Sequence, residues 1–169
     1  MFESIMLRDN IHEIIKGYCS KNPFKNGCTA VLSTILPIKV FRSLDKHQID
    51  SLSEIYTSTA DSFIEHFAND KVRVIISKTV KLKGILILFI NQNALIVKNT
   101  AVSYENSKPE SRLIDIDIYC GGQQITRTHL NLPPRQCIIC EAPASRCIFE
   151  GNHRLDDLKK EFQSYLVKN

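Results

Sequence analysis

The chain has 169 residues, of which 43% are hydrophobic, and a formal net charge of +4 at pH 7. This length suits one domain with a real core, and the composition is ordinary for a soluble globular protein. The weak positive charge fits an anionic substrate. It does not argue for nucleic acid, because no basic run is interleaved with aromatic residues and tryptophan is absent.

No secretory signal is visible at the amino terminus, and the most apolar stretch, residues 84–90, is too short to span a bilayer. We therefore expect a cytoplasmic protein that does not bind a membrane. In that compartment the six cysteines would be reduced or metal-bound rather than paired in disulfides.

The first part of the chain predicts two helices on either side of a buried strand. Residues 8–19 have apolar positions at helical spacing. Residues 28–36 are apolar and β-prone, which predicts a buried strand that ends at Pro37. Ser43 is the predicted cap of a long helix whose apolar positions continue to Phe67.

The middle of the chain predicts more of the sheet. Residues 72–80 and 84–90 have the composition of two neighbouring strands. Residues 93–105 have apolar positions at helical spacing, although their strand propensity is also high. Residues 112–119 alternate as a strand, and the glycine pair at 121–122 predicts a tight turn after it.

The remaining elements complete the expected fold. Residues 123–127 are typical of the return strand of a hairpin, and the proline pair at 133–134 ends the sheet. Apolar positions at helical spacing in residues 155–166 predict a final helix. Because helices and strands alternate irregularly, we expect a single α+β domain over residues 1–169 with a mixed or antiparallel sheet.

The strand at residues 112–119 has Asp115 and Asp117 on one face and isoleucines on the other. Such carboxylates lie roughly 6.5–7 Å apart at their Cβ atoms and repel each other unless a cation lies between them. Mg²⁺ is often bound by one or two carboxylates together with phosphates. The pattern predicts a magnesium site for a polyphosphate, with an exposed strand face as the alternative. Glu105 or Glu110 could add a third carboxylate.

Four basic residues occur at predicted strand ends and turns. Arginine binds phosphate through two parallel hydrogen bonds and lysine binds it as a point charge, so together they could line one anionic pocket. The alternative is that each is a solvated surface charge. These residues are Lys39, Arg112, Arg127 and Arg135.

Three cysteines and a histidine near the carboxyl terminus have metal-ligand spacing. Cys137 and Cys140 form a Cys-x-x-Cys pair, and Cys147 and His153 follow. Three thiolates and one imidazole can close a tetrahedral zinc site, which would stabilise the fold rather than catalyse a reaction. The alternative is a group of small buried hydrophobic residues. No Ser-His-Asp order, P-loop or dinucleotide fingerprint accompanies these residues.

Taken in order, these motifs resemble those of one enzyme family, the holo-acyl-carrier-protein synthase of citrate lyase, also called apo-citrate lyase phosphoribosyl-dephospho-CoA transferase. The resemblance is strong over residues 105–166 and fainter before them. The matching motifs are Arg112-Leu113, Asp115-Ile116-Asp117, Leu132-Pro133-Pro134-Arg135, Cys137-x-x-Cys140, Ala144, Cys147 and His153. The chain departs from the family pattern at Asn10-Ile11, Pro37-Ile38, Lys108, Ser111 and Phe149.

The resemblance implies a nucleotidyltransferase-like fold and reaction. The donor would be 2'-(5''-triphosphoribosyl)-3'-dephospho-CoA, and the acceptor a serine hydroxyl on the acyl-carrier subunit of citrate lyase. Attack at the α-phosphate would release pyrophosphate and leave a phosphodiester-linked prosthetic group. Asp115 and Asp117 would hold Mg²⁺, and the four basic residues would bind the triphosphate. Two alternatives stay open: the malonate decarboxylase counterpart with the same donor, and a zinc-stabilised binding module without catalysis.

Overall fold

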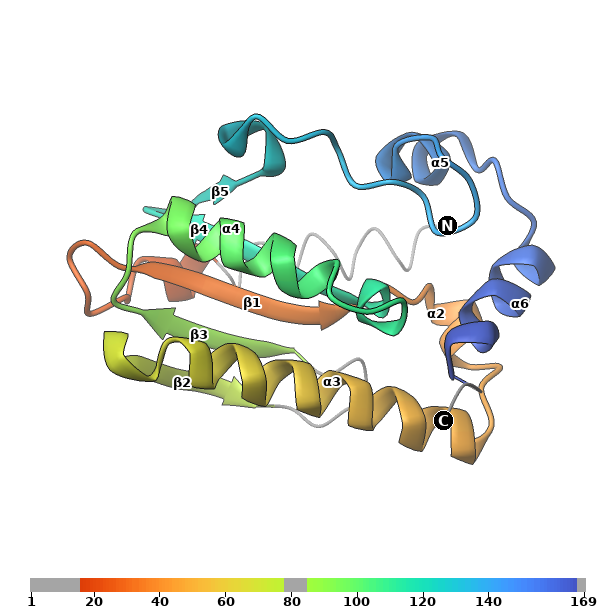
Figure 1. Ribbon diagram of the computed structural model, residues 1–169, viewed down its shortest axis with the longest axis horizontal. Coiled ribbons are helices and arrows are strands. Elements are labelled where there is room, and N and C mark those ends of the chain that lie inside the picture. Colours follow the sequence, from red (N-terminus) through yellow and green to blue (C-terminus); the bar gives the residue numbers. More distant parts are fainter. Residues whose placement is uncertain (1–15, 78–84, 167–169) are drawn as a thin grey trace.

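A five-stranded antiparallel sheet forms the centre of the computed structural model, which describes residues 16–77 and 85–166 (Figure 1). The strand order is β2-β3-β1-β4-β5, and every neighbouring pair is antiparallel. This confirms the predicted α+β class and selects an antiparallel sheet. The strands are β1 (Cys28–Thr34), β2 (Val72–Ser77), β3 (Leu86–Ile90), β4 (Ile114–Cys120) and β5 (Gln123–Ile125).

Helices α3 and α4 run along one face of this sheet, and α5 and α6 lie beyond one end of it (Figure 1). Residues 1–15 and 78–84 lie outside the described part of the chain, so the predicted helix at 8–19 is seen only from residue 16. The helices are α2 (Ile38–Phe41), α3 (Lys46–His66), α4 (Ala94–Glu105), α5 (Ala144–Glu150) and α6 (Leu155–Leu166), with short 3-10 helices η1 (Ala68–Asp70), η3 (Glu110–Leu113) and η4 (Arg127–Leu130).

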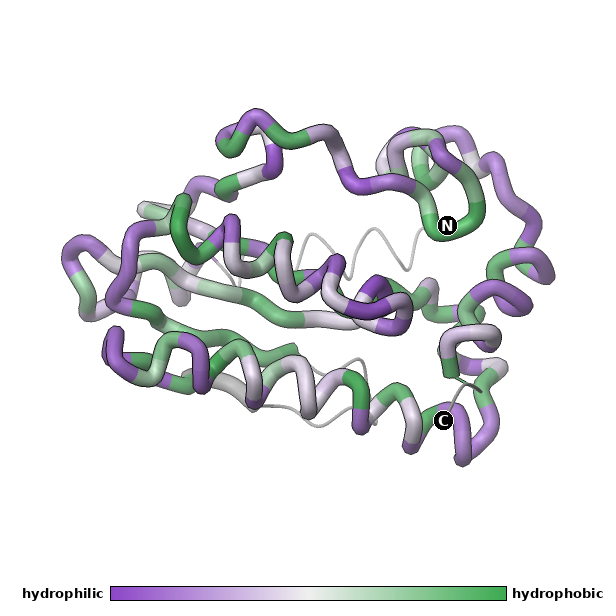
Figure 2. The backbone as a smooth tube through the Cα atoms, viewed as in Figure 1, coloured by the Kyte–Doolittle hydropathy of each residue, from purple (hydrophilic) through white to green (hydrophobic). Residues whose placement is uncertain are grey.

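The main core lies between the sheet and helices α3 and α4. Ile116 of β4 and Leu32 of β1 are fully buried there, together with Phe63 of α3 and Val97 of α4. Strands β1 and β3 are mostly hydrophobic along their length in Figure 2, because both faces of these central strands are buried. The alternation of β4 therefore directs its isoleucines into this core.

The opposite face of the sheet has a smaller apolar cluster. Cys19, Val31, Ile87 and Tyr119 are buried together on it. The strand register places Asp117 beside Val31 on the same face. The two aspartates of β4 thus face away from α3 and α4.

The long helix begins two residues later than predicted. Its N-cap is Asp45, whose carboxylate accepts a hydrogen bond from the Gln48 backbone at 2.8 Å, while the Gln48 side chain accepts one from the Asp45 backbone at 3.1 Å. This reciprocal capping box satisfies two backbone donors at once. Ser43 instead donates to the carbonyl of Val40, so its prediction as the cap was wrong.

The return strand of the hairpin is shorter than predicted. Strand β5 ends at Ile125, and Arg127 begins the 3-10 helix η4 rather than continuing the strand. The backbone N–H and the hydroxyl of Thr126 both contact Nδ1 of His129. These contacts cap the amino-terminal end of η4. In the described ranges, no helix is both long and apolar enough to cross a membrane.

Candidate functional site

The predicted aspartate pair lies on a part of β4 that has a neighbouring strand on one side only. Strand β5 pairs with β4 only from Ile118 to Cys120, while β1 pairs with β4 from Ile114 to Tyr119. Asp115 and Asp117 are half-buried, and the isoleucines between and beside them are fully buried. The predicted alternation is confirmed, and the pair lies beside an open sheet edge.

Side chains satisfy the backbone groups of this open edge. Ile116 donates its N–H to Glu105 Oε1 at 3.1 Å, and its carbonyl accepts a hydrogen bond from Lys98 Nζ at 2.9 Å. The carbonyl of Ile114 accepts a bond from Arg135 at 3.0 Å. Unpaired strand edges promote association with other strands, and buried polar groups need partners. These three bonds satisfy backbone groups of β4 that β5 does not reach.

Arg135 connects the loop before the cysteine segment to the first aspartate. Its Nη1 lies 3.0 Å from Asp115 Oδ1, and its Nη2 also donates to the carbonyl of Arg112 at 2.8 Å. The Arg135 side chain is 20% exposed and the Asp115 side chain 37% exposed. A cationic group thus already lies against one carboxylate, at a place that solvent can reach.

The second aspartate is in a different electrostatic environment. Asp117 Oδ1 accepts a hydrogen bond from Gln124 Nε2 at 2.7 Å. Burial raises the pKa of Asp117 to about 7, and the nearby charge of Asp115 adds to this rise. The negative charges of the two adjacent carboxylates are thus only partly compensated by the protein. A divalent cation bound between them would stabilise the ionised form of both.

The four predicted phosphate ligands lie in different surroundings, and Arg135 contacts Asp115 of the aspartate pair directly. Arg112 donates to the carbonyls of Gln136 and Cys137 at 3.2 and 3.0 Å. Arg127 forms a 2.8 Å ion pair with buried Glu105. Lys39 is exposed on α2, which follows the end of β1.

Sequence reasoning missed two residues of this site. Lys98 is 5% exposed on α4, and Gln124 of β5 contacts Asp117. A signal for Lys98 was present, because it stands on the apolar stripe of its helix next to Val97 and Ala101. Charged residues are rarely buried without partners, so a lysine on such a stripe indicates a specific contact.

The Cys/His cluster is brought together as its spacing predicts. The ligand atoms of Cys137, Cys140, Cys147 and His153 all lie within 4.8 Å of one another. Cys137 Sγ is 3.2 Å and Cys140 Sγ 3.5 Å from His153 Nε2, and the sulfurs of Cys140 and Cys147 are 3.5 Å apart. Ligands of tetrahedral zinc at about 2.3 Å would be separated by roughly 3.8 Å, so this cluster fits the ion.

The backbone around the cluster has the form of a tight loop followed by a short helix. Cys137 donates its N–H to the carbonyl of Ala142 at 2.8 Å, which closes the loop, and the Ile139 N–H points at Cys137 Sγ at 3.5 Å. Burial opposes ionisation of Cys137, but hydrogen bonds from the backbone of Ile139 and Cys140 and from neighbouring thiols outweigh it and lower its pKa to about 7. A thiolate, the form that binds metal, is therefore accessible near neutral pH.

Residues 30–169 match the model of one protein family, apo-citrate lyase phosphoribosyl-dephospho-CoA transferase. That range contains the whole sheet except its first two residues, both aspartates and the Cys/His cluster. The chain belongs to the apo-citrate lyase phosphoribosyl-dephospho-CoA transferase family.

Individual relatives support the same family over a shorter segment. The chain is 38% identical over 72 residues to a protein named CitXG from Leuconostoc mesenteroides subsp. cremoris, a match that covers 41% of this chain and 15% of that protein. It is 35% identical over 71 residues to the apo-citrate lyase phosphoribosyl-dephospho-CoA transferases of Escherichia coli O9:H4 (strain HS) and Shigella boydii serotype 18. The match to each of these two covers 41% of this chain and 39% of the relative.

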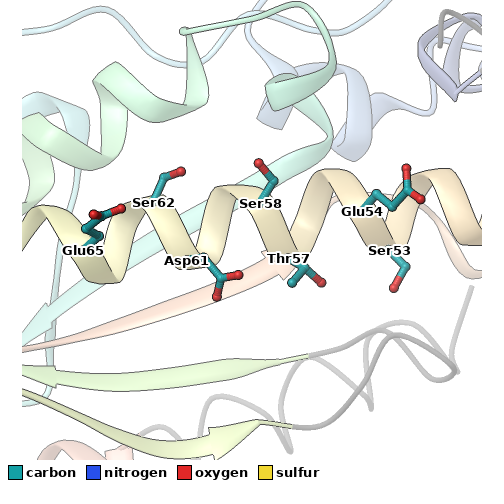
Figure 3. Close-up of a pocket in the computed structure, with 7 residues that line it drawn as sticks. All are labelled: Ser53, Glu54, Thr57, Ser58, Asp61, Ser62 and Glu65. Carbon is teal, nitrogen blue, oxygen red and sulfur yellow. The ribbon is translucent and has the colours of Figure 1, made fainter.

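Two hollows on this family member lie away from the aspartate pair. One, of about 550 Å³, follows the outer side of α3, where Ser58 and Ser62 point toward α4 and Asp61 points the other way (Figure 3). The other, of about 310 Å³, lies between α3 and the carboxyl end of α4, with Lys108 as its basic residue. Apart from Ile55 and Lys108 in the second hollow, the lining side chains are hydroxylic or acidic, which does not suit a triphosphate.

Proposed function

We propose that this protein transfers the prosthetic group of 2'-(5''-triphosphoribosyl)-3'-dephospho-CoA to a serine of the acyl-carrier subunit of citrate lyase, with release of pyrophosphate. The observation that supports this most is the half-buried Asp115–Asp117 pair at the open edge of β4, in a chain of the transferase family. The Escherichia coli and Shigella boydii relatives are named as apo-citrate lyase phosphoribosyl-dephospho-CoA transferases, which supports the transfer but not its individual steps.

The reaction forms one bond at phosphorus and breaks one. The oxygen of the acceptor serine attacks the α-phosphorus of the donor, the bond from that phosphorus to the pyrophosphate oxygen breaks, and the hydroxyl proton passes to water. Phosphoryl and nucleotidyl transfers depend mainly on positioning and charge neutralisation, so the protein needs no nucleophile of its own. The partner protein supplies the hydroxyl.

In this proposal Asp115 and Asp117 hold Mg²⁺, which would neutralise phosphate charge and lower the pKa of the acceptor hydroxyl. Arg135 lies beside Asp115 with a partly exposed guanidinium, so it is our first candidate for the triphosphate. Arg112 and Arg127 have internal partners, and with exposed Lys39 they remain proposed phosphate ligands. The family of this chain and its lack of a strong positive charge support a nucleotide donor over nucleic acid.

We assign the Cys/His cluster a structural zinc ion. Its four ligands leave no open coordination position, and closed sites of this type stabilise folds. Arg112 donates to the carbonyl of Cys137, and Arg135 stands two residues before it. The zinc loop would therefore fix the position of two arginines near the aspartates. We place the reaction in the cytoplasm, where six unpaired cysteines stay reduced.

Mass spectrometry of the carrier tests this function. The protein, the donor and Mg²⁺ are incubated with the apo carrier of citrate lyase or with that of malonate decarboxylase. We expect the citrate lyase carrier to gain the mass of the prosthetic group. Faster labelling of the other carrier would favour the malonate decarboxylase counterpart. If neither carrier is labelled and the donor does not bind, a zinc-stabilised binding module would be the better assignment.

A further inference from the structure

Two oppositely charged side chains of α4 are buried against the strand that bears the aspartates. Lys98 is 5% exposed and Glu105 is 2% exposed. They stand seven residues apart, about 10.5 Å along the helix axis and nearly on the same side of it. We call Lys98 and Glu105 together the α4 brace. Burying a charged side chain costs free energy, whereas burying an apolar one does not. The burial of both charges of the α4 brace therefore indicates that they make specific contacts.

Both residues of the α4 brace bind the residue between the two aspartates. Glu105 accepts the N–H of Ile116, which belongs to the peptide group that joins Asp115 to Ile116. Lys98 donates to the carbonyl of Ile116, which belongs to the peptide group that joins Ile116 to Asp117. Each aspartate is therefore attached to a peptide plane that one residue of the α4 brace holds.

Within residues 16–77 and 85–166, no neighbouring strand holds these two peptide groups. The pairing of β5 with β4 begins at Ile118, so Ile116 lies beyond the end of β5. Glu105 is itself fixed by its 2.8 Å ion pair with Arg127 of η4. Both of its carboxylate oxygens thus have protein partners, which makes Glu105 unsuited to be the third metal ligand.

We propose that Lys98 and Glu105 are positioning residues of the nucleotidyl transfer site, which hold the Ile116 peptide groups so that the Asp115 and Asp117 carboxylates meet one metal ion. The proposal rests on the proposed function, because it needs the aspartate pair to bind a metal. Neither residue touches the metal or the substrate. Residues that orient metal ligands in this way typically change metal affinity by about 10–100-fold when they are replaced.

The Lys98→Met variant distinguishes a role of Lys98 in holding β4 from an effect of its positive charge. At pH 8.5, above the pKa of Asp117, a Lys98 that acted only through its positive charge would repel a nearby cation, so its removal would strengthen the binding of that cation. If Lys98 holds the strand, its removal weakens binding. We expect Mn²⁺ alone, measured by electron paramagnetic resonance, to bind about 10–100-fold more weakly to Lys98→Met than to the unmodified protein. Lys98→Arg, which keeps a donor, should bind more tightly than Lys98→Met.

A pair of Glu105 variants gives an independent comparison. Glu105→Gln and Glu105→Leu remove the same charge, but only the glutamine keeps an oxygen that can accept the Ile116 N–H. We expect Mn²⁺ to bind about 10-fold more weakly to Glu105→Leu than to Glu105→Gln. This comparison decides the question if Lys98→Met does not fold. Lys25→Met, at an exposed position before β1, is the control for loss of a lysine.

The outcomes separate the two proposals. If the unmodified protein binds Mn²⁺ and the folded Lys98→Met variant binds it equally or more tightly, Lys98 only closes a sheet edge and the positioning role is overturned. Equal affinities of the two Glu105 variants would overturn it for Glu105. If the unmodified protein binds no Mn²⁺, the positioning role is overturned, and carrier labelling decides the proposed function separately. In labelling assays, the positioning role lowers kcat and leaves the KM for the carrier unchanged.

Discussion

The two aspartates on β4 differ in how the protein compensates their charge. Asp115 has an arginine at 3.0 Å, whereas Asp117 has a neutral glutamine at 2.7 Å and a carboxylate as its neighbour. Burial, followed by the charge of Asp115, raises the pKa of Asp117 to about 7. Ionisation of Asp117 in the metal-free protein therefore costs stability, which metal binding would recover.

The direction of the pKa shift predicts how the stability of Asp117→Asn compares with that of the unmodified protein at different pH values. Because the pKa of Asp117 is raised from 3.8 in the folded protein, the stability it contributes falls as pH rises from about 4 to about 7. Asparagine does not ionise and can still accept from Gln124. We expect Asp117→Asn to be about 2 kcal/mol more stable than the unmodified protein at pH 8 in a buffer without Mg²⁺, and nearly equal at pH 4.

Thermal unfolding at the two pH values measures this difference. Adding Mg²⁺ at pH 8 should raise the melting temperature of the unmodified protein and leave that of Asp117→Asn unchanged. A stability difference that does not vary with pH would contradict the raised pKa of Asp117.

At the residue scale, the local sequence pattern was enough to predict the positions of the aspartates, but not to predict which residues contact them. Alternation on a strand determines that Asp115 and Asp117 share a face. The contact of Arg135 with Asp115 spans twenty residues of chain and depends on how the loop after η4 folds back. The burial of Lys98 depends on the docking of α4 on β4, which no local pattern contains.

At the element scale, the start of α3 shows how a cap is selected. Both Ser43 and Asp45 belong to the residue types that cap helices, but only Asp45 is followed by a glutamine three residues later. That glutamine was a readable signal. The strand after the glycine turn was predicted too long for a similar reason, because the hydrogen bonds of Thr126 with His129 begin η4.

The N-cap of α3 gives a matched pair of variants. Asp45→Ala removes the acceptor for the Gln48 N–H and should lower the free energy of unfolding by about 1 kcal/mol. Ser43→Ala removes only a hydroxyl that donates to Val40 in the preceding turn and should change it by less than about 0.5 kcal/mol. Urea unfolding of the two variants measures the difference. If Ser43→Ala lowered the free energy of unfolding more than Asp45→Ala, Ser43 rather than Asp45 would be the N-cap.

The Cys/His cluster predicts a metal content. Four ligands at mutual distances below 4.8 Å should bind about one zinc ion per chain, which elemental analysis of the purified protein measures. Cys140→Ser should lose the zinc and melt at a lower temperature, because zinc binding contributes to folding. Cys120→Ser, at an exposed cysteine outside the cluster, is the control. A folded, zinc-free protein would show that the four residues are only a buried cluster.

At the scale of the whole molecule, the elements place two centres close together. The core between the sheet and helices α3 and α4 fixes β4, and the open edge of β4 presents the aspartates. Arg112 and Arg135 connect this edge to the loop of the Cys/His cluster. The α+β class and the cluster followed from periodicity and spacing, whereas the antiparallel order of the sheet and the relation between the two centres required the three-dimensional structure.

We propose that the aspartate pair carries the transfer reaction, and the rate of carrier labelling tests this role most directly. The apo acyl-carrier subunit of citrate lyase is incubated with donor, Mg²⁺ and either the unmodified protein or Asp117→Asn, and its mass is followed with time. We predict that the unmodified protein labels the carrier only with Mg²⁺, and that the folded variant labels it at least about 100-fold more slowly. Labelling by Asp117→Asn at the unmodified rate would contradict the account.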